Sequence, residues 1–207
     1  DHLDLHSFPT RRSSDLSGSV KFSYIPAATI RFTHETKGPI PNALVTAEPH
    51  GFIGKTNVQG EVTLIKMPVR TYMFTVRPET LPEIVFTEKT LADGMILTMP
   101  NSHPTLSITS PVKGHSYSTA HAVTFAGSGI DVEDGNLLDS LLIWKSDVDG
   151  ELGRGSTLTV KSLSGGHHTI TLDGSDMDGA AARASVGIDV TDLQLDSYFP
   201  ADRKSVV

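Results

Sequence analysis

The amino-acid sequence predicts an all-β protein made of two tandem antiparallel β-sandwich modules. Short runs in which apolar and polar residues alternate recur along most of the 207-residue chain, and turn residues separate them. Aromatic residues make up only 6 % of the chain, whereas it contains 18 glycines and 12 prolines. No segment keeps apolar residues at helical spacing over three turns. We therefore expect almost no helix and many short strands joined by turns.

The first half contains seven candidate strands. In ALVTAE, the alternate residues Ala43, Val45 and Ala47 form an apolar set, and a period of two places such a set on one buried face. Prolines punctuate these runs, and proline is poorly tolerated inside a central strand. The strands are expected at about 29–35, 43–48, 52–56, 61–66, 71–77, 83–88 and 94–99.

The second half repeats this style after the stretch MPNSHPT, which carries two prolines and no strand pattern and is predicted to link the modules. Trp144, the only tryptophan, lies beside Leu142 and is expected in the core. Gly127–Gly129 is predicted to be a loop, and Asp-Gly pairs predict tight turns at Gly135, Gly150, Gly174 and Gly179. Strands are expected in TLSITSP, HAVTFAG, LLIWKS, STLTVKS, HHTITLD and ARASVGIDV.

The two ends of the chain have a different origin in our interpretation. Residues 1–16 and 202–207 can be encoded by one DNA sequence read on opposite strands, and they resemble translated sequencing adapter. We expect residues 17–28 to end a preceding region, 29–100 and 105–191 to form the two sandwiches with a linker at 101–104, and 192–201 to begin a following region.

Residues 29–100 resemble a carboxypeptidase regulatory-like domain, which has a transthyretin-like β-sandwich. The resemblance is carried by GPIPNALVTA, by the turn in TNVQGEVTL and by MPVRTYMFTV. Asn57 stands where the family has Asp, and Arg70 stands where it has Gly. Both departures fall in turns.

Residues 105–191 resemble bacterial immunoglobulin-like or PKD-type domains. The matching features are the loop DVEDG, the strand with Trp144, the hairpin DGELG and the strand GHHTITL. Neither family is itself catalytic, and both usually accompany secreted or cell-surface enzymes, adhesins and stalks. The resemblance therefore implies a secreted or cell-surface location.

Charge and composition exclude several classes of function. The net charge of −7 argues against a nucleic-acid partner, because such binders concentrate Lys and Arg on one face. Without cysteine there is no disulfide framework, thiolate metal site or cysteine nucleophile. No apolar run approaches the ~20 residues that cross a bilayer, so we expect no membrane insertion of this segment.

Two acidic loops form the candidate site. In an immunoglobulin-like strand order, DVEDG and DGSDMDG emerge at the same end of the sandwich, where their carboxylates can converge on Ca²⁺. The alternative is that Asp and Gly are present because turns need them. Asp147–Gly150, expected at the opposite end, is explained only in that second way. The candidate ligands are Asp131, Glu133, Asp134, Asp173, Asp176 and Asp178.

No catalytic constellation is indicated by spacing. There is no Gly-x-Ser-x-Gly elbow, and the adjacent His167 and His168 on one strand point to opposite faces. We therefore expect a non-catalytic spacer or accessory segment that contacts neighbouring domains of the same chain. The alternative is an adhesive module that binds polysaccharide or a cell-surface protein, stabilised by calcium.

Overall fold

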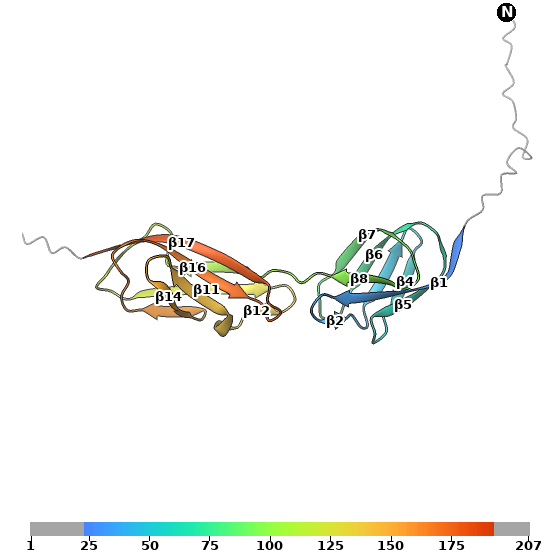
Figure 1. Cartoon of the computed structure of the whole chain (residues 1–207), viewed down its shortest axis with the longest axis horizontal. Helices are drawn as coiled ribbons and strands as arrows, with labels where there is room; N and C mark the ends of the chain where they lie inside the picture. Colours follow the sequence, from blue (N-terminus) through green and yellow to red (C-terminus); the bar gives the residue numbers. More distant parts are fainter. Residues whose placement is uncertain (1–22, 193–207) are drawn as a thin grey trace, which may run out of the picture.

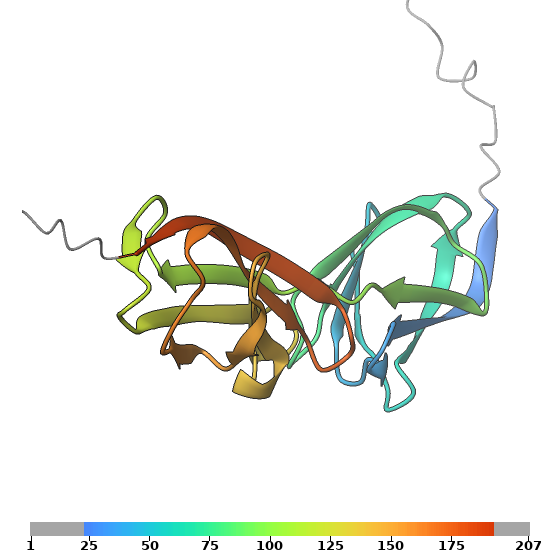
Figure 2. The ribbon, with the colours of Figure 1, turned by 60° about the vertical axis from the view of Figure 1, so that its left-hand side comes forward.

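The computed structural model describes residues 23–192, which fold into two β-sandwich modules placed end to end (Figure 1). The two modules remain separate lobes after the view is turned by 60° (Figure 2). Within the described residues the one helical element is a 3₁₀ turn, η2 (Asp139–Leu141). The predicted all-β class is confirmed. The ends interpreted as adapter, 1–16 and 202–207, lie outside the described residues, as do 17–22 and 193–201.

The first module has two four-stranded sheets. In one sheet the long strand β1 pairs antiparallel with β2 and β5 and parallel with β8. The other sheet has the order β4-β3-β6-β7. The strands are β1 (Tyr24–His34), β2 (Gly38–Pro39), β3 (Leu44–Glu48), β4 (Phe52–Lys55), β5 (Glu61–Pro68), β6 (Thr71–Arg77), β7 (Ile84–Thr90) and β8 (Met95–Met99).

Alternating residues of these strands form the first core. Phe32 on β1 packs edge-on against Phe74 on β6, with their ring centroids 6.1 Å apart, and both side chains are fully buried. β1 begins five residues before the expected start at 29, and its first half pairs with β5. Ala28 is buried in this core, so residues 24–28 belong to the first sandwich and not to a preceding region.

The second module also has two sheets. One contains β9, β11, β12 and β15, and the other has the order β10-β17-β16-β13-β14. The strands are β9 (Thr105–Ser110), β10 (Ser116–Ser118), β11 (Val123–Asp131), β12 (Gly135–Asn136), β13 (Leu142–Ser146), β14 (Gly150–Arg154), β15 (Thr157–Val160), β16 (Gly166–Ser175) and β17 (Ala181–Thr191).

Trp144 lies at the centre of the second core. Its side chain is fully buried, its ring centroid lies 5.4 Å from that of Phe125, and its indole Nε1 donates a hydrogen bond to the Gly155 carbonyl at 2.9 Å. The indole therefore combines apolar packing with a satisfied polar group. This confirms the expected position of the tryptophan.

The predicted loop at Gly127–Gly129 and the predicted turn at Gly174 are wrong. Gly127 and Gly129 lie inside β11, and Gly174 lies inside β16. A Cβ atom at Gly127 would meet the Trp144 ring at 3.1 Å and the Ser107 carbonyl oxygen at 2.7 Å. These glycines are needed because large core side chains occupy the space in front of them, and not because the backbone turns.

The segment 100–104 connects β8 to β9 and has no regular secondary structure. Pro104 is buried, and Asn101 and Ser102 are partly buried. Because these residues are buried or partly buried, the short connection lies against the modules and does not extend into solvent. The end of β1 therefore comes close to the loops of the second module (Figure 1).

Candidate functional site

The two acidic loops are shaped by their own aspartates. Asp131, at the end of β11, accepts hydrogen bonds at Oδ1 from the amides of Glu133 and Asp134, at 2.8 and 2.9 Å. Asp176, between β16 and β17, accepts at Oδ1 from the amides of Asp178 and Ala180, at 2.9 and 2.8 Å. One oxygen of each carboxylate thus stabilises a turn, as aspartate often does.

The loops also converge. One carboxylate oxygen from each of Asp131, Asp134 and Asp176 lies within 4.8 Å of the others, and the Met177 amide donates to Asp134 Oδ2 at 3.3 Å. Asp131 and Asp176 are each 3 % exposed. Charges this close and this buried repel one another unless a cation or hydrogen-bond donors compensate them.

Asp173 lies apart from these residues. It points from β16 to Lys145 Nζ at 2.9 Å and to Arg183 Nε at 2.6 Å. Hydrogen bonds from Arg183, followed by those from Lys145, hold the pKa of Asp173 below its usual value. Of the six candidate ligands, the structure therefore brings three together, places Glu133 and Asp178 beside them, and puts Asp173 in an ion-pair network on a sheet.

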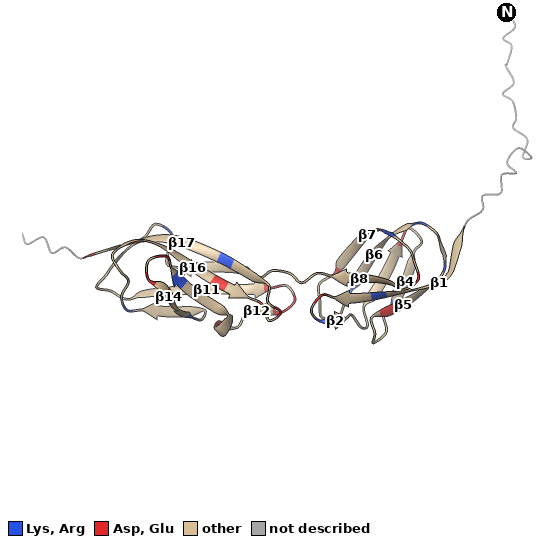
Figure 3. Ribbon diagram, viewed as in Figure 1, with Lys and Arg blue, Asp and Glu red and all other residues tan. Residues whose placement is uncertain are grey.

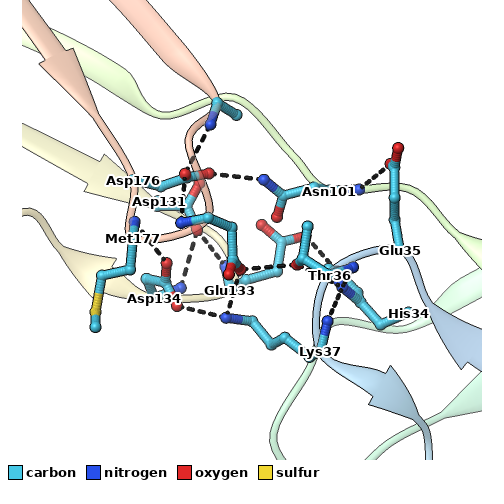
Figure 4. Close-up of polar contacts among 12 residues, drawn as sticks. His34, Glu35, Thr36, Lys37, Asn101, Asp131, Glu133, Asp134, Asp176 and Met177 are labelled. Carbon is cyan, nitrogen blue, oxygen red and sulfur yellow. Dashed lines mark hydrogen bonds and ion pairs between the residues drawn. The ribbon is translucent and has the colours of Figure 1, made fainter.

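The end of the first module meets these loops. Lys37, in the turn after β1, places Nζ 2.7 Å from Asp134 Oδ1 (Figure 4). The same Nζ lies 2.9 Å from Asp178 Oδ2. Thr36 Oγ1 donates to Asp178 Oδ2 at 2.8 Å. The bonds from Lys37 and Thr36 lower the pKa of Asp178, and the two carboxylates raise the pKa of Lys37. Opposite charges therefore face each other across the junction (Figure 3).

The linker adds further bonds. The Asn101 backbone amide donates to Glu35 Oε2 at 3.1 Å, and its Nδ2 donates to Asp176 Oδ2 at 2.8 Å. Ser102 Oγ donates to Glu133 Oε1 at 2.8 Å. Asn101 consequently joins a side chain of the first module to one of the second.

A buried histidine completes the junction. Nδ1 of His34 accepts hydrogen bonds from the amides of Thr36 and Lys37, at 3.2 and 3.3 Å, which places the ring proton on Nε2. Nε2 lies 3.9 Å from Glu133 Oε1, and neither side chain is more than 2 % exposed. Figure 4 shows the Glu133 carboxylate between His34 and Asn101.

The junction also contains unpartnered polar atoms. In the described part of the chain, four buried side-chain atoms have no hydrogen-bond partner: His34 Nε2, Asn101 Oδ1, Asp131 Oδ2 and Glu133 Oε2. All four lie where the two modules meet. Such atoms are uncommon in native proteins, and each points to water, an ion or a functional role.

Sequence reasoning missed the contribution of the first module. Lys37 stands in a turn with no recognisable motif, and its partners Asp134 and Asp178 lie 97 and 141 residues further along the chain. The linker residues Asn101 and Ser102 carried a usable signal, because two polar side chains lie between prolines next to the loop end of the sandwich.

A serine, a histidine and an aspartate meet elsewhere without forming a catalytic triad. Ser146 Oγ lies 2.8 Å from His168 Nδ1, and Asp149 Oδ2 lies 3.7 Å from that same nitrogen. In a triad the serine and the carboxylate bond opposite ring nitrogens. Here Nε2 is bonded to the Ser164 carbonyl at 2.7 Å, and His168 is fully buried. His168 is thus a core residue, whereas the preceding residue, His167, is exposed. The two side chains therefore point to opposite faces of the sheet, as predicted.

Comparison with known proteins gives weak likenesses. No family model matches the chain, and no curated protein sequence matches it. Fibronectin(III)-like modules of Clostridium thermocellum CbhA align at 16 % identity, covering 85 % of this chain and 97 % of theirs, with a TM-score of 0.41. Domains 4 and 5 of the S-layer protein SbsC align at 18 % identity, covering 72 % and 77 %, with a TM-score of 0.29. A form of the Bacillus cereus major pilin subunit aligns at 14 % identity, covering 80 % and 69 %, with a TM-score of 0.30.

The described residues include no helix that is long and apolar enough to cross a membrane.

Proposed function

We propose that the chain is a non-catalytic accessory segment of a larger secreted or cell-surface protein, in which two sandwiches are held at a fixed relative orientation. The observation that carries this proposal is the junction itself. Lys37 bonds two carboxylates of the second module, and Asn101 bonds a residue of each module. A flexible spacer would not need such contacts.

The mechanical role follows from this arrangement. Two rigid sandwiches that cannot swing freely hold whatever precedes and follows them at a defined separation and angle. The resemblance of residues 29–100 to a carboxypeptidase regulatory-like domain, and of 105–191 to immunoglobulin-like or PKD-type domains, supports this role, because such modules usually accompany surface enzymes and stalks.

Small-angle X-ray scattering tests the proposal on the whole chain. A fixed orientation predicts that one elongated shape fits the profile, and that Lys37→Met combined with Asn101→Ala broadens the distribution of inter-module distances. Asn136→Ala, an exposed position on β12, serves as the control. A wild-type profile that requires a wide ensemble of inter-module angles would overturn the proposal.

A second candidate function is binding of a polysaccharide or a surface protein. It is favoured by an open pocket of about 430 Å³ on the sheet of β13, β16 and β17, where Leu141 and Ile143 lie beside Asp173 and Arg183. Its size falls within the range of ligand sites. A glycan array and polysaccharide pull-down with the wild type and Arg183→Ala would test it, and signal lost in the variant would favour this function.

A further inference from the structure

We propose that the junction binds one Ca²⁺ ion, which is ligated by both acidic loops and by the linker and which locks the two modules together. This inference rests on the proposed function, since it names what regulates the fixed orientation. The ligands would be carboxylates of Asp131, Asp134 and Asp176, together with the Asn101 amide oxygen. This set differs from the sequence-based one, because it leaves out Glu133, Asp173 and Asp178 and includes the linker.

The first support is the size of the cluster. Two oxygens on one Ca²⁺ ion lie at most ~5 Å apart, twice the usual Ca–O distance. The oxygens of Asp131, Asp134 and Asp176 lie within 4.8 Å of one another, so one Ca²⁺ ion can contact all three.

The second support is independent of the acidic cluster as such. Asp131 Oδ2 is buried and has no partner, and it belongs to a side chain whose other oxygen is hydrogen-bonded. Turn formation explains Asp131 Oδ1 but gives Oδ2 no partner. Oxygen atoms buried without donors are costly unless a cation or water compensates them.

The linker supplies a neutral ligand. Asn101 Oδ1 is also buried and unpartnered, while the nitrogen of the same amide lies 2.8 Å from Asp176 Oδ2. A half-turn of the amide exchanges its oxygen and nitrogen, which places Oδ1 about 3 Å from the carboxylate, a normal separation for two ligands on one ion. Calcium accepts amide carbonyls as readily as carboxylates.

The charge balance also favours a divalent ion. Four carboxylates, those of Asp131, Glu133, Asp134 and Asp176, meet at the junction, and Lys37 reaches only the outer pair formed by Asp134 and Asp178. His34 adds no charge, because its Nδ1 accepts amide hydrogen bonds. With Asp178 and Lys37 included, five carboxylates and one ammonium leave a net charge of −4, of which a Ca²⁺ ion would offset half. The ion would also tie the linker to both loops.

The test is a calcium chloride titration of the whole chain by isothermal calorimetry, after removal of metal with chelator. We expect one site per chain. Asp131→Asn keeps the Oδ1 acceptor of the turn but removes the charge, and it should weaken binding roughly tenfold or more. Asp173→Asn is the matched control, because it makes the same change outside the cluster, and it should alter the affinity less than twofold.

Absence of calcium binding to the wild type, or equal weakening by both variants, would overturn the inference. ¹⁵N relaxation of the same samples separates it from the proposed function. Modules that tumble as one body without binding calcium would refute the cation site alone. Calcium binding to modules that tumble independently would refute both the fixed orientation and the locking role of the ion.

Discussion

Replacing Asn101 by Ala removes the bond from the linker to the buried carboxylate of the second module. Nδ2 donates to Asp176 Oδ2 at 2.8 Å, and Asp176 is 3 % exposed. A hydrogen bond to a charged group contributes about 1.5–3 kcal/mol, and its loss leaves a buried carboxylate oxygen without a donor. We expect Asn101→Ala to lower the free energy of unfolding of the second module by this amount.

The sequence contains a convenient probe for this measurement. Trp144 is the only tryptophan and is buried in the second core, so its fluorescence reports unfolding of that module. With a slope of about 1.5 kcal/mol per molar urea, the midpoint should fall by about 1–2 M in chelator-treated protein. Asn136→Ala should leave it unchanged. An Asn101→Ala midpoint within about 0.3 M of the wild type would refute the reasoning, because the linker would then contribute nothing to the folded module.

Three further predictions concern the second core, where Trp144 fluorescence reports unfolding, and the ion pair at the junction. Ser146→Ala should lower the free energy of unfolding by about 1–3 kcal/mol, because it leaves Nδ1 of the buried His168 without its 2.8 Å partner. Gly127→Ala should cost about 1–3 kcal/mol through overpacking against the neighbouring strand and the core. The pKa of Asp178 is lowered by Lys37, so the ion pair is intact above the ordinary aspartate pKa of about 3.9 and is lost as pH falls through the lower folded value. NMR of the Lys37 ammonium from pH 7 to pH 2 should follow this loss.

Each of these predictions has a matched control or a contrary outcome. Ser185→Ala, on an exposed position of β17, and Gly165→Ala, where an added Cβ atom would meet nothing closer than 3.8 Å, should each change the unfolding free energy by less than about 0.5 kcal/mol. Equal effects in a variant and its control would contradict the packing account. An ammonium signal that is unchanged below pH 3 would contradict the assigned ion pair.

Much of the fold follows from period-two patterning. Runs such as TYMFTVR bury alternate side chains, and β6 begins and ends where the pattern predicts. The pattern fails where a strand contains glycine, as in β11, because Gly127 looks like a loop residue until the bulk of Trp144 beside it is known. Very short strands such as β2 and β12 also escape it, since two residues carry no period.

The candidate site was predictable only within one module. Immunoglobulin-like strand order places the loops of Asp131 and Asp176 at one end, and the structure brings them together. Asp173 was misassigned because β16 continues through it, so its side chain turns to Arg183 on the sheet. Lys37 was not predictable, because its place at the junction depends on how two separately folded modules meet.

The most direct test of the fixed orientation is the measurement of residual dipolar couplings for backbone amides of both modules in one weakly aligned sample. A fixed orientation requires a single alignment tensor, equal in magnitude and direction for residues 24–99 and 105–191. Two tensors of different magnitude would show that the modules reorient independently, and would contradict the account.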